Sequence, residues 1–155
     1  MTKILVVYES KYGNTKRVAE TIVKGMQRVD RIEIALNEVK KIDRKAITSY
    51  DAIVFGGPTH FGGPTRNIKK FIDKLSSAPL DGKQFAVFDT YLKTNFEKVT
   101  KNMEQRMHEK APAMKMTVPG LSIKVEEMEG PIAEGELSKC EEFGATIASQ
   151  LMAPA

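Results

Sequence analysis

The chain has 155 residues, 41% hydrophobic and 28% charged, which fits one globular domain over residues 1–155 with a core of its own. Its formal net charge is +4, and the lysines are spread over several predicted helices. No basic stretch is interleaved with aromatic residues and no apolar run is long enough to cross a bilayer, so neither nucleic-acid binding nor membrane insertion is predicted. A weaker consequence of the charge is long-range attraction for an acidic protein partner.

The single cysteine excludes an internal disulfide and is typical of a protein from the reducing cytoplasm. The apolar pattern starts at residue 3, so no signal peptide is expected. Cys140 falls on the same helical face as Leu137 and Ile147, which predicts core packing rather than redox chemistry. The methionines from Met103 to Met128 are expected to fill gaps in the core. Two histidines and one cysteine offer no metal-ligand spacing.

Strand and helix patterns alternate along the chain. The predicted strands are 3–8, 31–35, 52–55, 85–88 and a last strand, 115–118 with 121–125, that is interrupted at Pro119-Gly120. Three helices are predicted at 14–27, at 43–47, where the helix is short, and at 134–152. Another is capped by Thr65 and has the apolar face Ile68, Phe71, Ile72 and Leu75. A further helix, after the fourth strand, has the apolar face Phe96, Val99, Met103 and Met107. This alternation predicts an α/β fold, a doubly wound five-stranded parallel sheet with helices on both faces.

The first predicted strand and helix are joined by Ser10-Lys11-Tyr12-Gly13-Asn14-Thr15. Free N–H groups of the first helical turn and the helix dipole favour an anion there. Ser10, Asn14 and Thr15 add side-chain donors, and Gly13 lets the backbone approach a ligand closely. The segment has neither the Gly-Lys-Ser/Thr of a P-loop nor the three spaced glycines of a dinucleotide turn. It predicts a different kind of phosphate-binding loop.

Two further loops follow the third and fourth predicted strands. The first is Pro58-Thr59-His60-Phe61-Gly62-Gly63 and the second is Asp89-Thr90-Tyr91-Leu92-Lys93. Because the carboxyl ends of parallel strands share one edge of the sheet, these loops should lie beside the phosphate loop. His60 and Phe61 are then placed to cover one face of a flat aromatic ring, with Tyr91 on the other face.

Together the three loops resemble the flavodoxin family over nearly the whole chain. Ser-x-Tyr-Gly-Asn-Thr is similar to the family's Ser/Thr-x-Thr-Gly-x-Thr loop, with Tyr12 where another Thr is usual. The resemblance implies strand order 2-1-3-4-5, non-covalently bound FMN and electron transfer between redox partner proteins. The implied FMN contacts are the phosphate on Ser10, Asn14 and Thr15, the ring flanked by Pro58, Thr59, His60 and Phe61, and its pyrimidine side near Thr90, Tyr91 and Lys93.

Several features depart from a typical flavodoxin. The chain is basic, has no Trp and lacks the long insertion of long-chain flavodoxins. The first ring loop is also similar to that of flavodoxin-like quinone reductases, so an NAD(P)H:quinone oxidoreductase, with His60 steering hydride or proton transfer, is an alternative. A regulatory module that has lost its flavin is another. The electron carrier is favoured over the reductase because no inserted element builds a nicotinamide pocket. Separately, Lys93 is expected to make the redox potential of the bound flavin less negative.

Overall fold

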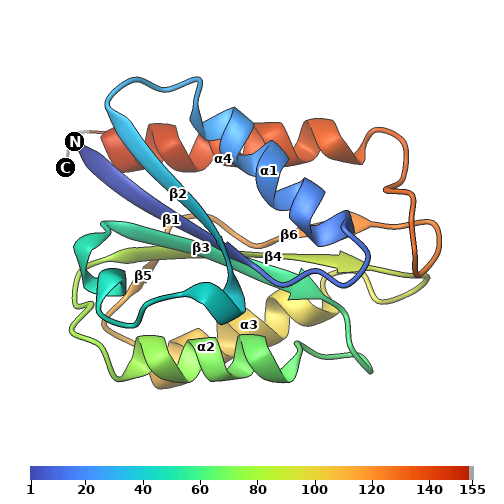
Figure 1. Cartoon of the computed structure of the whole chain (residues 1–155), viewed down its shortest axis with the longest axis horizontal. Coiled ribbons are helices and arrows are strands. Elements are labelled where there is room, and N and C mark those ends of the chain that lie inside the picture. The colour runs from blue at the N-terminus through green and yellow to red at the C-terminus, as the bar shows by residue number, and fades with distance from the viewer. Residues whose placement is uncertain (154–155) are drawn as a thin grey trace.

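The structure, a computed structural model, describes residues 1–153 and has a parallel sheet at its centre (Figure 1). The strands are β1 (Thr2–Tyr8), β2 (Ile32–Glu38), β3 (Ala52–Pro58), β4 (Gln84–Tyr91), β5 (Lys115–Met116) and β6 (Leu121–Lys124). Their order is β2-β1-β3-β4-β5, and β6 also pairs with β4 in parallel. The predicted order 2-1-3-4-5 is therefore confirmed, with the fifth position divided between β5 and β6 on either side of Pro119 and Gly120.

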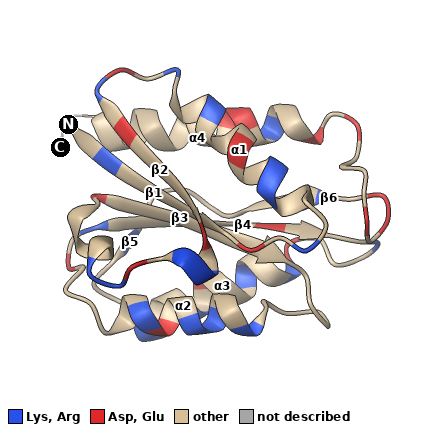
Figure 2. Ribbon diagram, in the orientation of Figure 1, with Lys and Arg blue, Asp and Glu red and all other residues tan. Residues whose placement is uncertain are grey.

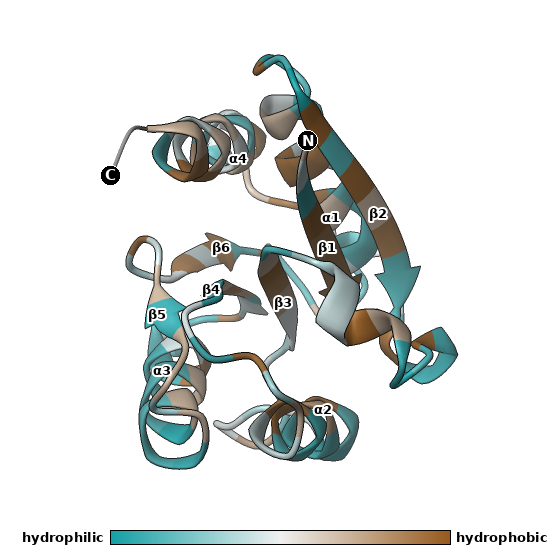
Figure 3. Ribbon diagram, turned by 90° about the vertical axis from the view of Figure 1, so that its left-hand side faces the viewer, coloured by the Kyte–Doolittle hydropathy of each residue, from teal (hydrophilic) through white to brown (hydrophobic). Residues whose placement is uncertain are grey.

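Two helices cover each face of the sheet. In Figure 1, α1 (Asn14–Met26) and α4 (Glu136–Met152) lie above it, and α2 (Arg66–Ser76) and α3 (Lys98–Lys110) lie below it. Figure 3 shows the hydrophobic strands enclosed between these layers. The apolar side chains accordingly form two separate clusters, one under α2 and α3 and one under α1 and α4.

The helix ends follow the expected signals at most positions. The Thr65 side chain caps α2 by accepting a hydrogen bond from the Ile68 amide at 3.2 Å, as predicted. The short helix predicted at 43–47 is wrong in position, because the chain forms two 3₁₀ turns there, η1 (Val39–Lys41) and η2 (Ala46–Ser49). The last helix starts two residues later than expected, after Gly135 adopts a left-handed conformation with φ 84°.

The helices α1 and α4 pack with their backbones in close approach. A Cβ atom at Gly25 would lie 1.9 Å from the Glu141 carbonyl oxygen, and one at Gly144 would lie 1.9 Å from that of Ile22. These two glycines therefore set the distance between the helices. Cys140 is buried in the same layer, as expected, and burial raises the pKa of its thiol to about 12.

The expectation that the methionines fill the core is only partly correct. Met103, Met107 and Met114 are buried, but Met116 and Met128 have exposed fractions of 42% and 65%. Among residues 1–153, no helix has both the length and the apolar composition that crossing a membrane requires.

Candidate functional site

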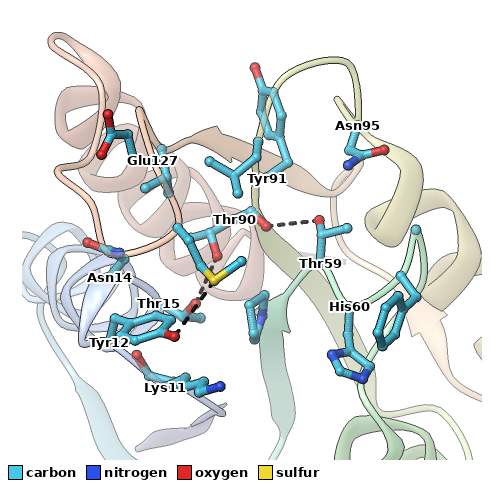
Figure 4. A pocket seen from close by; sticks show the side chains of 17 residues that line it. Lys11, Tyr12, Asn14, Thr15, Thr59, His60, Thr90, Tyr91, Asn95 and Glu127 are labelled. Carbon is cyan, nitrogen blue, oxygen red and sulfur yellow. Dashed lines mark hydrogen bonds between the residues drawn. The ribbon is translucent and has the colours of Figure 1, made fainter.

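A cavity of about 420 Å³ opens at the carboxyl edge of the sheet, where the winding of the chain reverses (Figure 4). Its volume is in the range of about 300–1,000 Å³ found for small-molecule and cofactor sites. The lining residues are Ser10, Lys11, Tyr12, Asn14, Thr15, Pro58, Thr59, His60, Phe61, Gly62, Thr90, Tyr91, Leu92, Asn95, Val125, Glu127 and Met128. The structure therefore brings all three predicted loops to one cavity and adds a fourth, from the end of β6.

The first turn of α1 faces this cavity without an internal cap. Gly13 precedes the helix in a left-handed conformation, with φ 93°, and no side chain of the described residues accepts a bond from the first turn. The first turn also contains no acidic residue. By contrast, Thr65 caps α2 and the Asp89 carboxylate accepts a bond from the Thr100 amide in the first turn of α3. The helix-dipole charge at α1 is thus left for a ligand.

Hydroxyl groups join the loops at the floor of the cavity. The side-chain oxygens of Thr15 and Thr90 are 2.9 Å apart, and both residues are nearly fully buried. Thr59 donates twice to the Thr90 carbonyl oxygen, from its amide and from its hydroxyl, each at 3.0 Å. Ser10 Oγ accepts a bond from the Gly13 amide at 3.0 Å, which leaves the Ser10 hydroxyl proton free to donate to a ligand.

The loop after β3 ends in a two-residue hairpin turn. His60 and Gly63 exchange two backbone hydrogen bonds of 2.8 and 3.1 Å, and Phe61 and Gly62 between them have φ angles of 49° and 77°. Two successive positive φ angles are the requirement of a type I′ turn. The turn holds the Phe61 side chain 97% exposed, in edge contact with His60 at 4.5 Å between ring centroids. A flat apolar ligand is the kind of group that such a pair of rings can cover.

The loop after β4 presents a second aromatic pair. Tyr91 packs edge-on against Phe96, with ring centroids 5.4 Å apart, and Figure 4 shows Tyr91 and Asn95 at the same rim of the cavity. Partial burial and, next, the negative charge of Glu136 raise the pKa of the Tyr91 hydroxyl, so it stays protonated at neutral pH. Lys93 is exposed, with φ 55°, and does not line the cavity.

Asp89 was expected at this loop, but its side chain lies below the loop and away from the cavity. It is fully buried and accepts bonds from Ser122 Oγ at 2.6 Å and from the Thr100 amide at 2.9 Å. Burial raises the pKa of this carboxyl to about 6, although both hydrogen bonds oppose the shift. Ser122 Oγ in turn accepts a bond from the Glu97 amide at 2.9 Å. Asp89 therefore ties β4, α3 and β6 together beneath the loop.

Four of the predicted residues are near the cavity without lining it: Gly13, Gly63, Asp89 and Lys93. Four lining residues were not predicted: Asn95, Val125, Glu127 and Met128. The Tyr12 hydroxyl donates to Met128 Sδ at 3.7 Å across the cavity, a contact drawn in Figure 4. The split last strand was the available signal, because β6 ends at the same edge as β4 and its following loop must lie beside the site.

Comparison with known proteins places this arrangement in a family. The family model described as "Flavodoxin domain" matches residues 5–123, most of the chain and three of the four loops. The chain belongs to the flavodoxin family. FMN is the cofactor that the family implies. The uncapped, acid-free first turn of α1 with the Ser10 and Thr15 hydroxyls fits the phosphate of FMN in chemical type.

Individual relatives agree with the family assignment. The chain is 38% identical over 88 residues to a flavodoxin from Clostridium saccharobutylicum, which is 57% of this chain and 55% of that protein. It is 29% identical over 93 residues to a flavodoxin from Aquifex aeolicus, covering 58% and 50% of the two chains. The chain thus matches about half the length of these curated relatives.

Solved structures extend the likeness to the whole fold. Flavodoxin 2 from Bacillus cereus has a TM-score of 0.80 at 28% identity, over 96% of this chain and 99% of that one. A flavodoxin from the domain Archaea has a TM-score of 0.84 at 24% identity, over 98% and 100% of the two chains, which shows a shared fold.

Proposed function

We propose that the protein is a single-domain cytoplasmic electron carrier that binds FMN in the cavity and passes electrons between redox proteins. The observation that carries this proposal is the uncapped first turn of α1, which opens into a cavity edged by aromatic side chains. A reducing cytoplasmic location agrees with the lone, buried Cys140.

Each part of the cavity has a distinct task in this proposal. The first-turn amides of α1, with Ser10 and Thr15, hold the phosphate. The His60–Phe61 turn and Tyr91 orient the flavin ring and exclude water from its faces. Bound FMN supplies one- and two-electron chemistry, while the protein supplies position and electrostatics.

Exposed apolar side chains at the rim favour a carrier over an enzyme with a closed pocket. Large apolar side chains with high exposure gather there: Tyr12 at 42%, Phe96 at 57%, Met128 at 65% and Phe61 at 97%. Such groups on a protein surface mark interaction sites, and a redox partner that contacts them comes close to the cavity. The quinone reductase alternative differs in one measurable respect, which is steady turnover with NAD(P)H and a quinone.

The decisive experiment compares FMN with riboflavin in a fluorescence titration of the purified protein. We expect FMN to bind at one equivalent and more tightly than riboflavin, because riboflavin has no phosphate for the first turn of α1. Hydrogen bonds to a charged group contribute about 1.5–3 kcal/mol each. Ser10→Ala should therefore weaken FMN binding by roughly tenfold or more and leave riboflavin nearly unchanged.

Thr21→Ala is a matched control, because it removes a hydroxyl from the same helix that donates to the Arg17 carbonyl oxygen outside the cavity. Equal affinities for FMN and riboflavin would contradict the phosphate site. Quinone-dependent NAD(P)H oxidation at about 1–10³ per second, the usual range for enzymes, would replace the carrier with the reductase.

A further inference from the structure

Charge is distributed very unevenly over this chain. Residues 39–77 contain eight of the 24 Lys and Arg residues and three of the 20 Asp and Glu residues. Residues 121–153 contain two Lys and seven Glu. The first segment includes η1, η2 and α2, and the second includes the strand β6 and the helix α4. Helices α2 and α4 lie on opposite sides of the sheet (Figure 1). Residues 39–77 are therefore the more positive of these two segments, in a chain whose net charge is +4.

The basic residues of η1 and α2 form a group that we name the α2 basic face. Helix α2 buries its apolar residues under the sheet, so its remaining side chains are exposed or half-buried, and η1 packs beside it (Figure 2). The face consists of Lys40, Lys41, Arg66, Lys69, Lys70 and Lys74. Within residues 1–153, none of these six side chains has a carboxylate within 4 Å.

Three of the seven glutamates in residues 121–153 form ion pairs within the part of the chain that the structure describes. Glu141 pairs with Lys24 and Arg28, Glu142 pairs with Arg28 at 3.1 Å, and Glu136 pairs with Lys139 at 2.7 Å. Those contacts reduce the field that α4 projects into solvent. The α2 basic face has no such ion pairs within residues 1–153, so its positive charge is available to attract an acidic partner at a distance.

The α2 basic face also adjoins the cavity. Its member Arg66 is the first residue of α2, only three residues after Gly63, which closes the turn that displays Phe61. A partner on this face would contact the exposed Phe61 ring at its edge, with its own redox centre beside the cavity. Apolar contact flanked by unpaired charge is the usual composition of a protein interface with a polar rim.

We propose that the α2 basic face docks an acidic redox protein, an inference that rests on the carrier function proposed above. Nucleic acid fits the face less well, because the exposed Asp73 carboxylate interrupts the charge of α2. Docking of this kind accelerates encounter about 10- to 10³-fold at low salt and loses that gain as salt rises.

The test uses one redox protein in two charge states. The FMN-loaded protein is reduced without oxygen and mixed with native cytochrome c, which is basic, or with fully succinylated cytochrome c, which is acidic. At about 20 mM ionic strength we expect the succinylated form to be reduced at least threefold faster, and at about 500 mM the rates should converge. Lys70→Glu should lower the rate for the succinylated form at low salt by about threefold. Lys115→Glu, an equal charge change at the exposed strand β5, should not.

Amide chemical shifts of the oxidised protein give a readout independent of electron transfer. Addition of succinylated cytochrome c should perturb η1, α2 and the Phe61 turn and leave α4 unchanged. Equal rates for the two cytochromes, or faster reduction of the native form, would overturn the proposed face while leaving the carrier function intact. Failure to reduce either form would instead contradict the carrier function. Tighter binding of a 20-nucleotide RNA than of succinylated cytochrome c at equal salt would assign the face to nucleic acid and overturn the proposal.

Discussion

Phe61 shows how a single residue can be placed against its own backbone preference. A bulky side chain with φ 49° is a conformational outlier, and the left-handed region costs an L-residue about 1–2 kcal/mol. The cost is not recovered by burial, since the ring is 97% exposed. Strain of this kind persists where the surrounding structure imposes it, often at a ligand site. Here the turn imposes it, and the result is a ring beside His60 at the mouth of the cavity.

Phe61→Asn should separate stability from cofactor binding. The change creates Asn-Gly, the favoured pair for a type I′ turn, so the free energy of unfolding of the apoprotein should rise by about 1 kcal/mol in a urea titration. Loss of an aromatic contact should weaken FMN binding by roughly threefold to tenfold. Phe61→Tyr keeps the ring and serves as the control. Unchanged FMN affinity in Phe61→Asn would remove Phe61 from the flavin site.

At the scale of elements, buried polar groups connect the strand ends on both sides of the sheet. Thr90 and Asp89 are adjacent in β4, and their side chains point to opposite faces. Thr90 joins the loops after β1 and β3 at the cavity floor, through Thr15 and Thr59. Asp89 joins α3 and β6 on the other face, through Thr100 and Ser122. One dipeptide thus fixes the loop after β4 from both sides.

The buried Asp89 carboxyl makes a specific contribution to the pH dependence of stability. Its pKa is about 6 in the folded protein against an ordinary value of 3.8, so the folded state holds this proton more tightly than the unfolded state. The stability associated with the neutral form is therefore complete below about pH 4 and is lost as pH rises through 6. The full difference between the two pKa values, 3.8 and about 6, corresponds to about 3 kcal/mol.

Asp89→Asn should abolish this dependence, because the amide stays neutral and can still accept from the Thr100 amide and donate to Ser122 Oγ. We expect the variant to gain stability relative to the wild-type protein by about 1–3 kcal/mol between pH 4 and pH 7.5. Urea titrations of both proteins at several pH values measure that difference in the free energy of unfolding. The contributions of the other carboxyl groups are the same in both proteins and therefore cancel. A difference that is constant with pH would show that Asp89 is ionised throughout this range in the folded protein.

At the scale of the whole molecule, the sequence was sufficient for the architecture and for three of the loops. Buried parallel strands read as continuous apolar runs, such as Ile4–Val7, and their carboxyl ends must share an edge. The errors concern side-chain direction and irregular backbone. Asp89 alternates to the opposite face from Thr90, and the short helix predicted at 43–47 is replaced by the 3₁₀ turns η1 and η2. The loop that carries Met128 was missed because a methionine in a tail reads as core filling, whereas here it is 65% exposed.

The cavity depends on the whole fold, so cofactor binding and global stability should be coupled. Its walls come from four segments that are far apart in the chain, with Ser10, Thr59, Thr90 and Met128 as members. A ligand that needs all four binds the folded state alone and stabilises it by about 2.7 kcal/mol at 100 times its dissociation constant. For a domain of about 150 residues this should raise the melting temperature by roughly 5–11 °C.

Thermal unfolding of the apoprotein, followed by far-UV circular dichroism with and without FMN, measures this shift. Riboflavin at the same concentration should give a smaller shift, because it lacks the phosphate that the first turn of α1 accepts. Ser10→Ala should reduce the shift with FMN toward that with riboflavin. If FMN left the melting temperature unchanged at saturating concentration, the ligand would bind folded and unfolded chains alike, and a site assembled by the carboxyl edge of the sheet would be excluded.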